Sequence, residues 1–197
     1  MSADEFLSLA PAPVQERAQQ IRAQKIDGAR PRPSARLVDR SALLTPGRRA
    51  KILDAVAALV DENLFGRSEM CIQFAGLLQR ALVHLDLPAR AVVGWAIYYS
   101  GGREIFRWQH AWVRVGEEVI DGNVDSLFEN PTVPQTVDVA PYWGPIAETP
   151  ADRRLRADHG QELPSDNDVS EIWWPELRAS LDAISIEGVE QPPGADG

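Results

Sequence analysis

The sequence contains a single cysteine, Cys71, and only three histidines in 197 residues. One cysteine cannot form an intrachain disulfide, and the chain has no cysteine cluster of the kind that holds structural zinc. No segment approaches the ~18 uncharged apolar residues that a membrane-spanning helix requires. The longest such run, Ala91–Gly102, is interrupted by glycine and serine. Asp4 and Glu5 occupy positions where a signal peptide carries positive charge, so we expect a cytoplasmic protein.

The chain has fewer basic than acidic residues. It contains 20 lysines and arginines and 29 aspartates and glutamates, which gives a net charge of −9. The imbalance lies in residues 115–197, which hold 18 acidic and four basic residues, whereas residues 1–50 hold five and nine. A chain this acidic repels nucleic acid and anionic lipid, so we expect no nucleic acid and no membrane as a partner. The 44% of hydrophobic and 25% of charged residues exclude a disordered chain, a collagen and a coiled coil.

The first half of the chain has the periodicity of helices. Apolar residues recur every three to four positions over Val14–Ile26, and Gly28–Arg36 has the proline content of a linker. A second helix is predicted at Pro46–Asn63, where a proline suits the first helical position. Ser68 is the expected N-cap of a third helix, whose apolar stripe runs over Cys71–Leu85.

The periodicity then changes from 3.6 to 2. Two strands are predicted at Ala91–Ser100 and Glu104–Val115, joined by a Gly101-Gly102 hairpin turn, and a third at Val119–Asp125. Prolines break the pattern after residue 126, so we expect an irregular stretch followed by a short helix at Trp173–Ile184. The fold class predicted is α+β, with N-terminal helices and the Cys71 helix packed on an antiparallel sheet. The last residues, 186–197, are expected to be a disordered tail.

Cys71 lies in the first turn of its predicted helix. Main-chain N–H groups there have no acceptor within the helix, and the helix dipole favours negative charge. Both effects stabilise a thiolate, which is the nucleophilic form of cysteine. The alternative is that Cys71 is a small buried hydrophobic residue in the interface between helix and sheet.

His110 lies on the second predicted strand, on the same face as Trp108. With Gly101-Gly102 as the turn, His110 faces Val93 across the hairpin and Trp108 faces Trp95. A histidine among such neighbours is either a core residue with satisfied hydrogen bonds or a base for the thiol.

Acidic and amide side chains on the third predicted strand share the face of His110. One register of the second hairpin places Asn123 opposite His110, and another places Asp125 there. In both registers Asp121 points to the same side and is within reach of the imidazole. A carboxylate that takes the proton of one ring nitrogen leaves the other nitrogen free to act as a base.

Several segments together resemble the core of the transglutaminase-like superfamily. They are Ser68-Glu69-Met70-Cys71, the helix Phe74–Leu82, the run Leu87–Gly94, the tetrapeptide His110-Ala111-Trp112-Val113, and Val119-Ile120-Asp121. The resemblance covers roughly residues 66–125, and its most specific parts are the HAWV tetrapeptide and the cysteine-helix-LPAR-strand run. The short core is similar to small bacterial members, including the leader-peptide proteases of lasso-peptide pathways.

The resemblance implies a papain-like Cys-His-Asp triad formed by Cys71, His110 and Asp121. It also implies residues 45–185 as a catalytic domain, with residues 1–44 as an N-terminal helix and linker. The expected enzyme attacks an amide or peptide carbonyl through a Cys71 acyl-enzyme and needs no cofactor or metal. If water accepts the acyl group, the enzyme is a protease or amidase, which is the prediction we favour. If an amine accepts the acyl group, the enzyme is a transglutaminase or amide-forming acyltransferase.

Two further alternatives are a non-catalytic binding module that retains the fold and one subunit of a peptide-maturation pair. The partner expected in each case is a peptide or protein substrate, or a small amide.

An oxyanion formed during attack needs hydrogen-bond donors near the sulfur. The Cys71 main-chain N–H is one candidate, and the indole of Trp108 and the amide of Gln109 are candidates for the second. Strand alternation points Gln109 away, which favours Trp108. Asn123 is a further polar candidate, and Trp143 is either a substrate wall or a core residue.

The two remaining histidines are not expected to take part in the reaction. His84 lies about 20 Å from Cys71 by helix rise, and His159 falls in an acidic irregular segment.

Overall fold

The computed structural model describes residues 32–63, 67, 69–130, 133–164 and 168–187. It also describes six residues near the N-terminus, which are helical: Ala12, Gln15, Glu16, Gln19, Gln20 and Ala23. The rest of the helix predicted at Val14–Ile26 lies outside the described residues, as do residues 28–31 of the predicted linker and residues 188–197 of the predicted tail. The linker ends in a helical turn at Pro33–Arg36, and residues 186 and 187, predicted as the start of the tail, instead end the last helix.

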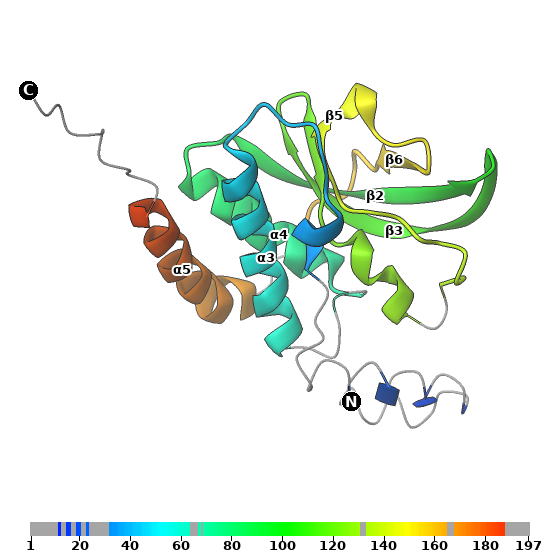
Figure 1. Ribbon diagram of the computed structural model, residues 1–197, viewed down its shortest axis with the longest axis horizontal. Helices are drawn as coiled ribbons and strands as arrows, with labels where there is room; N and C mark the ends of the chain where they lie inside the picture. Colours follow the sequence, from blue (N-terminus) through cyan, green and yellow to red (C-terminus); the bar gives the residue numbers. More distant parts are fainter. Residues whose placement is uncertain are drawn as a thin grey trace, which may run out of the picture.

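The described chain contains three long helices, several short helical turns and six strands (Figure 1). The long helices are α3 (Pro46–Asn63), α4 (Cys71–His84) and α5 (Trp174–Glu187). The short turns are η1 (Pro33–Arg36), η2 (Val124–Glu129), η3 (Ile146–Glu148) and the π-helical η4 (Asp168–Trp173). The strands are β1 (Val38–Asp39), β2 (Ala89–Ser100), β3 (Arg103–Val115), β4 (Glu118–Asp121), β5 (Tyr142–Pro145) and β6 (Arg153–Ala157).

All six strands belong to one sheet, in the order β1-β5-β4-β3-β2-β6. The prediction of an α+β fold is therefore confirmed. The sheet is mixed rather than antiparallel, because β1 pairs parallel to β5. The stretch after residue 126 is also more regular than expected, since β5 and β6 lie within it. Both strands are short, and β6 is rich in arginine, so neither has the apolar run by which a strand is usually predicted.

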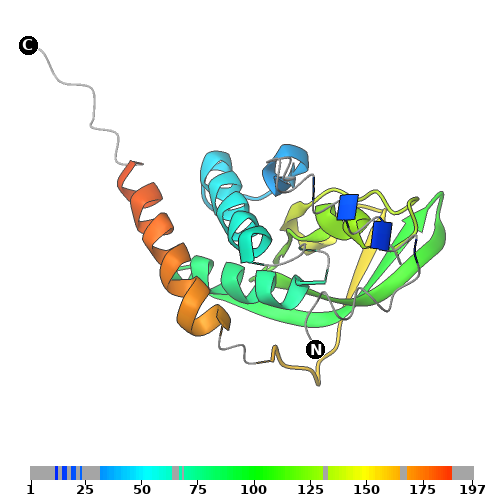
Figure 2. The same cartoon turned by 90° about the horizontal axis from the view of Figure 1, so that it is seen from below.

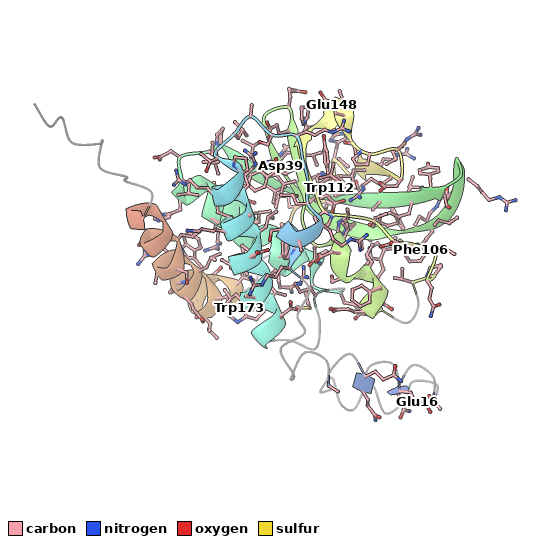
Figure 3. All side chains as sticks on the ribbon, viewed as in Figure 1. Glu16, Asp39, Phe106, Trp112, Glu148 and Trp173 are labelled. Atoms are coloured by element: carbon pink, nitrogen blue, oxygen red, sulfur yellow. The ribbon has the colours of Figure 1, made fainter. Side chains whose placement is uncertain are left out.

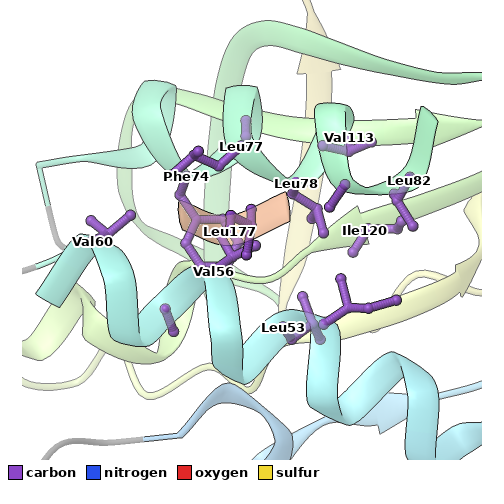
Figure 4. Packing of buried hydrophobic residues seen from close by; sticks show 14 of the residues in the cluster. Leu53, Val56, Val60, Phe74, Leu77, Leu78, Leu82, Val113, Ile120 and Leu177 are labelled. Atoms are coloured by element: carbon purple, nitrogen blue, oxygen red, sulfur yellow. The ribbon is translucent and has the colours of Figure 1, made fainter. Parts of the chain in front are cut away.

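The main core lies between the helices and one face of the sheet. Helix α4 packs on β2 and β3, and α3 and α5 pack on α4 (Figures 1 and 2). Figure 4 shows how Leu53 and Val56 of α3 meet Phe74 and Leu78 of α4 in this core. The apolar stripe predicted from the sequence of α4 is therefore the face that packs against the sheet. This contact fixes the position of Cys71, the first residue of the helix.

The β2–β3 hairpin departs from its predicted register. Its tip pairs as expected around Gly101 and Gly102, whose φ angles of +57° and +76° favour glycine. A bulge then leaves Ile105 unpaired, since Tyr98 faces Phe106 while Tyr99 faces Glu104.

The bulge shifts the rest of the hairpin by one residue. His110 therefore lies opposite Gly94, and Trp108 opposite Ala96, in place of the predicted Val93 and Trp95. A bulge of this kind has no marker in the sequence comparable to the glycine pair at the turn. The shift gives His110 a neighbour without a side chain.

The third predicted strand is shorter than expected. β4 ends at Asp121, and its pairing of Val113 with Ile120 is the register in which Asn123 would have faced His110. The chain leaves the sheet at Gly122, where a Cβ would lie 2.8 Å from Leu53 and 2.9 Å from Phe74. A glycine at this position lets the chain pass close to the helices, and the residues from Val124 to Glu129 form η2.

Among the described residues, no helix combines the length and the apolar character needed to cross a bilayer.

Candidate active site

Cys71 is the first residue of α4. Met70 is the N-cap of this helix and makes no hydrogen bond with its side chain, whereas Ser68, the predicted cap, lies outside the described residues. The thiol is buried, with 8% of the residue exposed. Its sulfur receives hydrogen bonds from the main-chain N–H groups of Ala111 on β3 and Ile72 in the first turn of α4. The start of the helix and the strand thus both direct positive dipoles at Cys71.

His110 lies between Cys71 and Asp121. Its Nε2 atom is 2.8 Å from Oδ1 of Asp121, so Nε2–H donates to the carboxylate. Its Nδ1 atom is buried and makes no hydrogen bond of regular geometry within the described part of the chain, and the Cys71 thiol interacts with the ring from that side. The His110 ring centroid lies 6.2 Å from that of Trp112, which is labelled in Figure 3. The imidazole is therefore held by aromatic packing and by one carboxylate.

The charges of the three residues support one another. Burial alone would raise the pKa of Cys71, but the interaction with the neighbouring His110 ring and the two N–H groups lower it below its ordinary value. Burial alone would lower the pKa of His110; the charge and hydrogen bond of Asp121, together with Cys71, raise it to about 10. The raised pKa of His110 keeps a proton on the imidazole at neutral pH, and the lowered pKa of Cys71 favours the thiolate beside it.

Arg153 is a fourth member of this array that the sequence did not reveal. Its Nη1 atom donates to Oδ2 of Asp121 over 2.9 Å, and both side chains are fully buried. Burial would raise the pKa of Asp121, but His110 and Arg153 together lower it, so the carboxylate stays ionised. One signal was available, because Arg153 and Leu155 share one side of β6 while Arg154 lies on the other, exposed side.

The contact between Arg153 and Asp121 requires a strongly curved sheet. β6 and β4 are separated by β2 and β3, so in a flat sheet they would lie about 14 Å apart. Arg153 pairs with Tyr98, and both point to the same face of the sheet as His110. The sheet therefore curls around this face, which encloses the His110–Asp121–Arg153 chain.

Asn123 and Asp125 do not contact His110; they bind Arg67 in the loop before Cys71. Both Oδ atoms of Asp125 accept from the Arg67 guanidinium, at 2.9 and 2.8 Å, and Asp61 accepts from its Nε at 3.0 Å. Asn123 donates to the Arg67 main-chain oxygen over 2.6 Å. These residues thus fix the segment that leads into Cys71, a structural role that replaces the predicted contact with the imidazole.

A cleft of about 210 Å³ opens beside the thiol. Its lining residues are Glu69, Cys71, Ile72, Val93, Trp108, Gln109 and His110. Trp108 is one of these residues, and its indole Nε1 is buried without a hydrogen-bond partner among the described residues.

Gln109 lines the same cleft, contrary to the prediction that it points away. Its side-chain amide donates to Gln161 over 2.8 Å. Trp143, by contrast, does not line the cleft, because it is fully buried in β5 as part of the main core. Of its two predicted roles, the core role is the observed one.

His84 lies at the far end of α4, where its Nε2 is 2.7 Å from Asp182 of α5, so it takes no part in the site. Within the described ranges, no group of three or more histidine, cysteine, aspartate or glutamate side chains is placed to hold a metal ion.

No family model matches this chain, and no curated protein matches it. Among solved structures, a crystal structure of a genomics target aligns with 78% of this chain and 83% of its own. The two share 14% sequence identity with a TM-score of 0.47, a likeness too weak to bear on activity.

Proposed function

We propose that the protein is a cysteine hydrolase that cleaves an amide or peptide bond through an acyl-enzyme on Cys71. The observation that carries this proposal is the buried chain of contacts from Cys71 through His110 to Asp121. A structural cysteine needs neither a histidine free at Nδ1 nor two N–H groups aimed at its sulfur. The same residues carry the resemblance to the transglutaminase-like superfamily, and we propose membership of that group.

The reaction starts from the thiolate–imidazolium pair. The Cys71 sulfur attacks the carbonyl carbon, and the oxyanion that forms accepts hydrogen bonds from the Cys71 main-chain N–H and from Nε1 of Trp108. The imidazolium of His110 then gives its proton to the leaving amine, which departs and leaves a thioester. Water, deprotonated by the now neutral His110, attacks the thioester and releases the acid and the thiolate.

Asp121 acts through His110. Its carboxylate fixes the proton on Nε2, so that Nδ1 faces the sulfur, and it stabilises the positive charge that His110 carries. Arg153 holds the second oxygen of Asp121, which fixes the carboxylate in the plane that His110 requires. Arg153 is therefore a positioning residue rather than a catalytic one.

Mass spectrometry of the protein incubated with a peptide library tests the proposal. We expect an acyl mass on Cys71 in the wild-type protein, followed by release of the free acid. Cys71→Ala and His110→Gln should abolish both. His84→Gln is the matched control, because it removes a histidine that bonds a carboxylate far from the cleft.

A folded Cys71→Ala protein that still releases acid would end the proposal. Transfer of the acyl group to an added primary amine in preference to water would instead identify an acyltransferase, which uses the same thioester.

A further inference from the structure

Strand β3 has one edge that is largely unpaired. β2 pairs along its whole length, whereas β4 pairs only with the last three residues, Val113, Arg114 and Val115. From residue 104 to residue 112, the edge of β3 opposite β2 carries no strand in the described part of the chain. Exposed main-chain N–H and C=O groups along such an edge are a template for an additional strand.

The direction of these groups follows from the contact at Cys71. In an antiparallel pair, the main-chain groups of alternate residues point toward the partner strand and those between point away. The N–H of Ala111 points away from β2, because it donates to the Cys71 sulfur. The pairing is regular from Phe106 onward, so Gln109 and Arg107 turn their N–H and C=O groups to this same edge.

The free edge leads directly to the nucleophile. Gln109 lies two residues from Ala111, about 7 Å along the strand, and it lines the cleft that contains Cys71. Both Gln109 and Arg107 are exposed. Ile72 of α4 and Val93 of β2 line the same cleft, and their apolar side chains suit one apolar side chain of a bound peptide.

We propose that the acyl part of the substrate is an extended peptide that adds to the free edge of β3 as a further strand. Its main chain exchanges hydrogen bonds with Gln109 and Arg107, and its reactive carbonyl lies beside Cys71. The inference rests on the proposed function and names its substrate class: an extended peptide segment, recognised through its main chain, rather than a compact amide.

Peptide aldehydes test this pairing without a known substrate. The probe is acetyl-tetraalanine aldehyde, to which the Cys71 thiolate adds at the aldehyde carbon while the oxygen takes a proton, so that no group leaves. Occupancy is measured as protection of Cys71 from alkylation by iodoacetamide, followed by intact mass. Four further probes each carry one N-methyl group on a different amide nitrogen, and four carry an ester oxygen in place of that N–H.

If the peptide adds to β3 as a strand, the modifications should weaken the protection of Cys71 at every second amide position of the probe. An N-methyl group at either of two alternate positions should weaken protection about tenfold, because a hydrogen bond to β3 is lost. An N-methyl group at either of the other two positions should weaken it by less than about threefold. The ester series removes the same donors without adding a methyl group and should show the same alternation.

Equal losses at all four positions, or none, would overturn the strand pairing, and so would a failure of the unmodified aldehyde to protect. The proposed function would survive these outcomes if Cys71 is still alkylated at neutral pH much faster than a cysteine in an unstructured peptide. Alkylation no faster than in that peptide would instead count against the thiolate, and thus against the proposed function.

Discussion

At the scale of single residues, the site is a line of four buried groups, Cys71, His110, Asp121 and Arg153, whose pKa shifts favour alternating charge along the line. Each is desolvated, and a buried charge is costly unless an opposite charge or a hydrogen bond offsets the loss of water. Cys71 and Asp121 each lie beside His110, and Arg153 closes the line at the far end. Removing any one member therefore takes a compensating charge away from each of its neighbours.

Asp121→Asn should reduce the single-turnover rate of Cys71 acylation by roughly 10²–10⁴, because the imidazolium loses the charge that stabilises it and the tautomer is no longer fixed. The matched control is Asp152→Asn. Asp152 also accepts from Arg153, over 2.8 Å, but it is partly exposed and does not face His110. We expect less than about a threefold change for that variant. Equal losses in both variants would show that Arg153, and not the imidazole, requires the charge of Asp121.

Arg153→Met should move the acidic limb of the pH profile of Cys71 alkylation to higher pH. The charge and hydrogen bond of Arg153 lower the pKa of Asp121, so without them the carboxyl takes a proton at higher pH and no longer supports the imidazolium. Arg153→Lys keeps the charge and should restore most of the shift. An unchanged acidic limb in a folded Arg153→Met protein would show that Arg153 contributes only packing and does not lower the pKa of Asp121.

At the scale of elements, the β2–β3 hairpin determines where His110 lies. The bulge at Ile105 brings Gly94 opposite His110, and there a Cβ would lie 2.2 Å from the Arg156 main-chain oxygen and 2.9 Å from the Trp112 ring. The missing side chain allows β6 to approach β2 and Trp112 to pack beside the histidine. The hairpin thus positions His110 directly and, through β6, positions Arg153.

Gly94→Ala should lower the free energy of unfolding by about 2 kcal/mol or more, because the added methyl group would displace β6 or Trp112. Gly47→Ala in the first turn of α3 is the control, since a Cβ at that position meets no atom within 4 Å. It should leave stability unchanged or raise it by about 0.5–1 kcal/mol. Urea denaturation measures both, and equal stability of the two variants would contradict the close approach of β6.

The elements that could be predicted from the sequence are those with strong local signals. The Pro46–Asn63 helix, the apolar stripe of α4 and the glycine turn were each read correctly, and the parity of the strands placed His110 and Asp121 on one face. The bulge, the end of β4 at Asp121 and the β6 strand depend on contacts between distant segments. Arg153 belongs to this second group, because its alternation with Arg154 in β6 marks an inward-facing side chain but does not identify Asp121, which lies across a curved sheet, as its partner.

At the scale of the whole molecule, stability should depend on pH through the same buried groups. The pKa of His110 is raised from 6.5 to about 10, so its contribution to stability is complete below about pH 6.5 and is lost as the pH rises through 10. The pKa of Asp121 is lowered, so its contribution is present above its ordinary value, about 4, and is lost as the pH falls below that value.

In Cys71→Ala the decline on the alkaline side should begin at lower pH, because Cys71 is one of the groups that raise the pKa of His110. The measurement is the urea midpoint of both proteins between pH 6 and 10.5. Identical pH profiles would mean that the thiol and the imidazole are not coupled.

The position of β6 in the chain also has a consequence for synthesis on the ribosome. Asp121 follows His110 by 11 residues, but Arg153 comes 32 residues after Asp121, on the far side of the sheet. Until that arginine emerges from the exit tunnel, the carboxylate has no guanidinium to hold its second oxygen, and the curved face cannot close over it. The nascent chain can form the α4 helix and the β2–β3 hairpin early, yet it completes the line of charges only after residue 153 has been translated and has left the tunnel. The order of translation therefore makes the contact between Arg153 and Asp121 the last of the buried line to form.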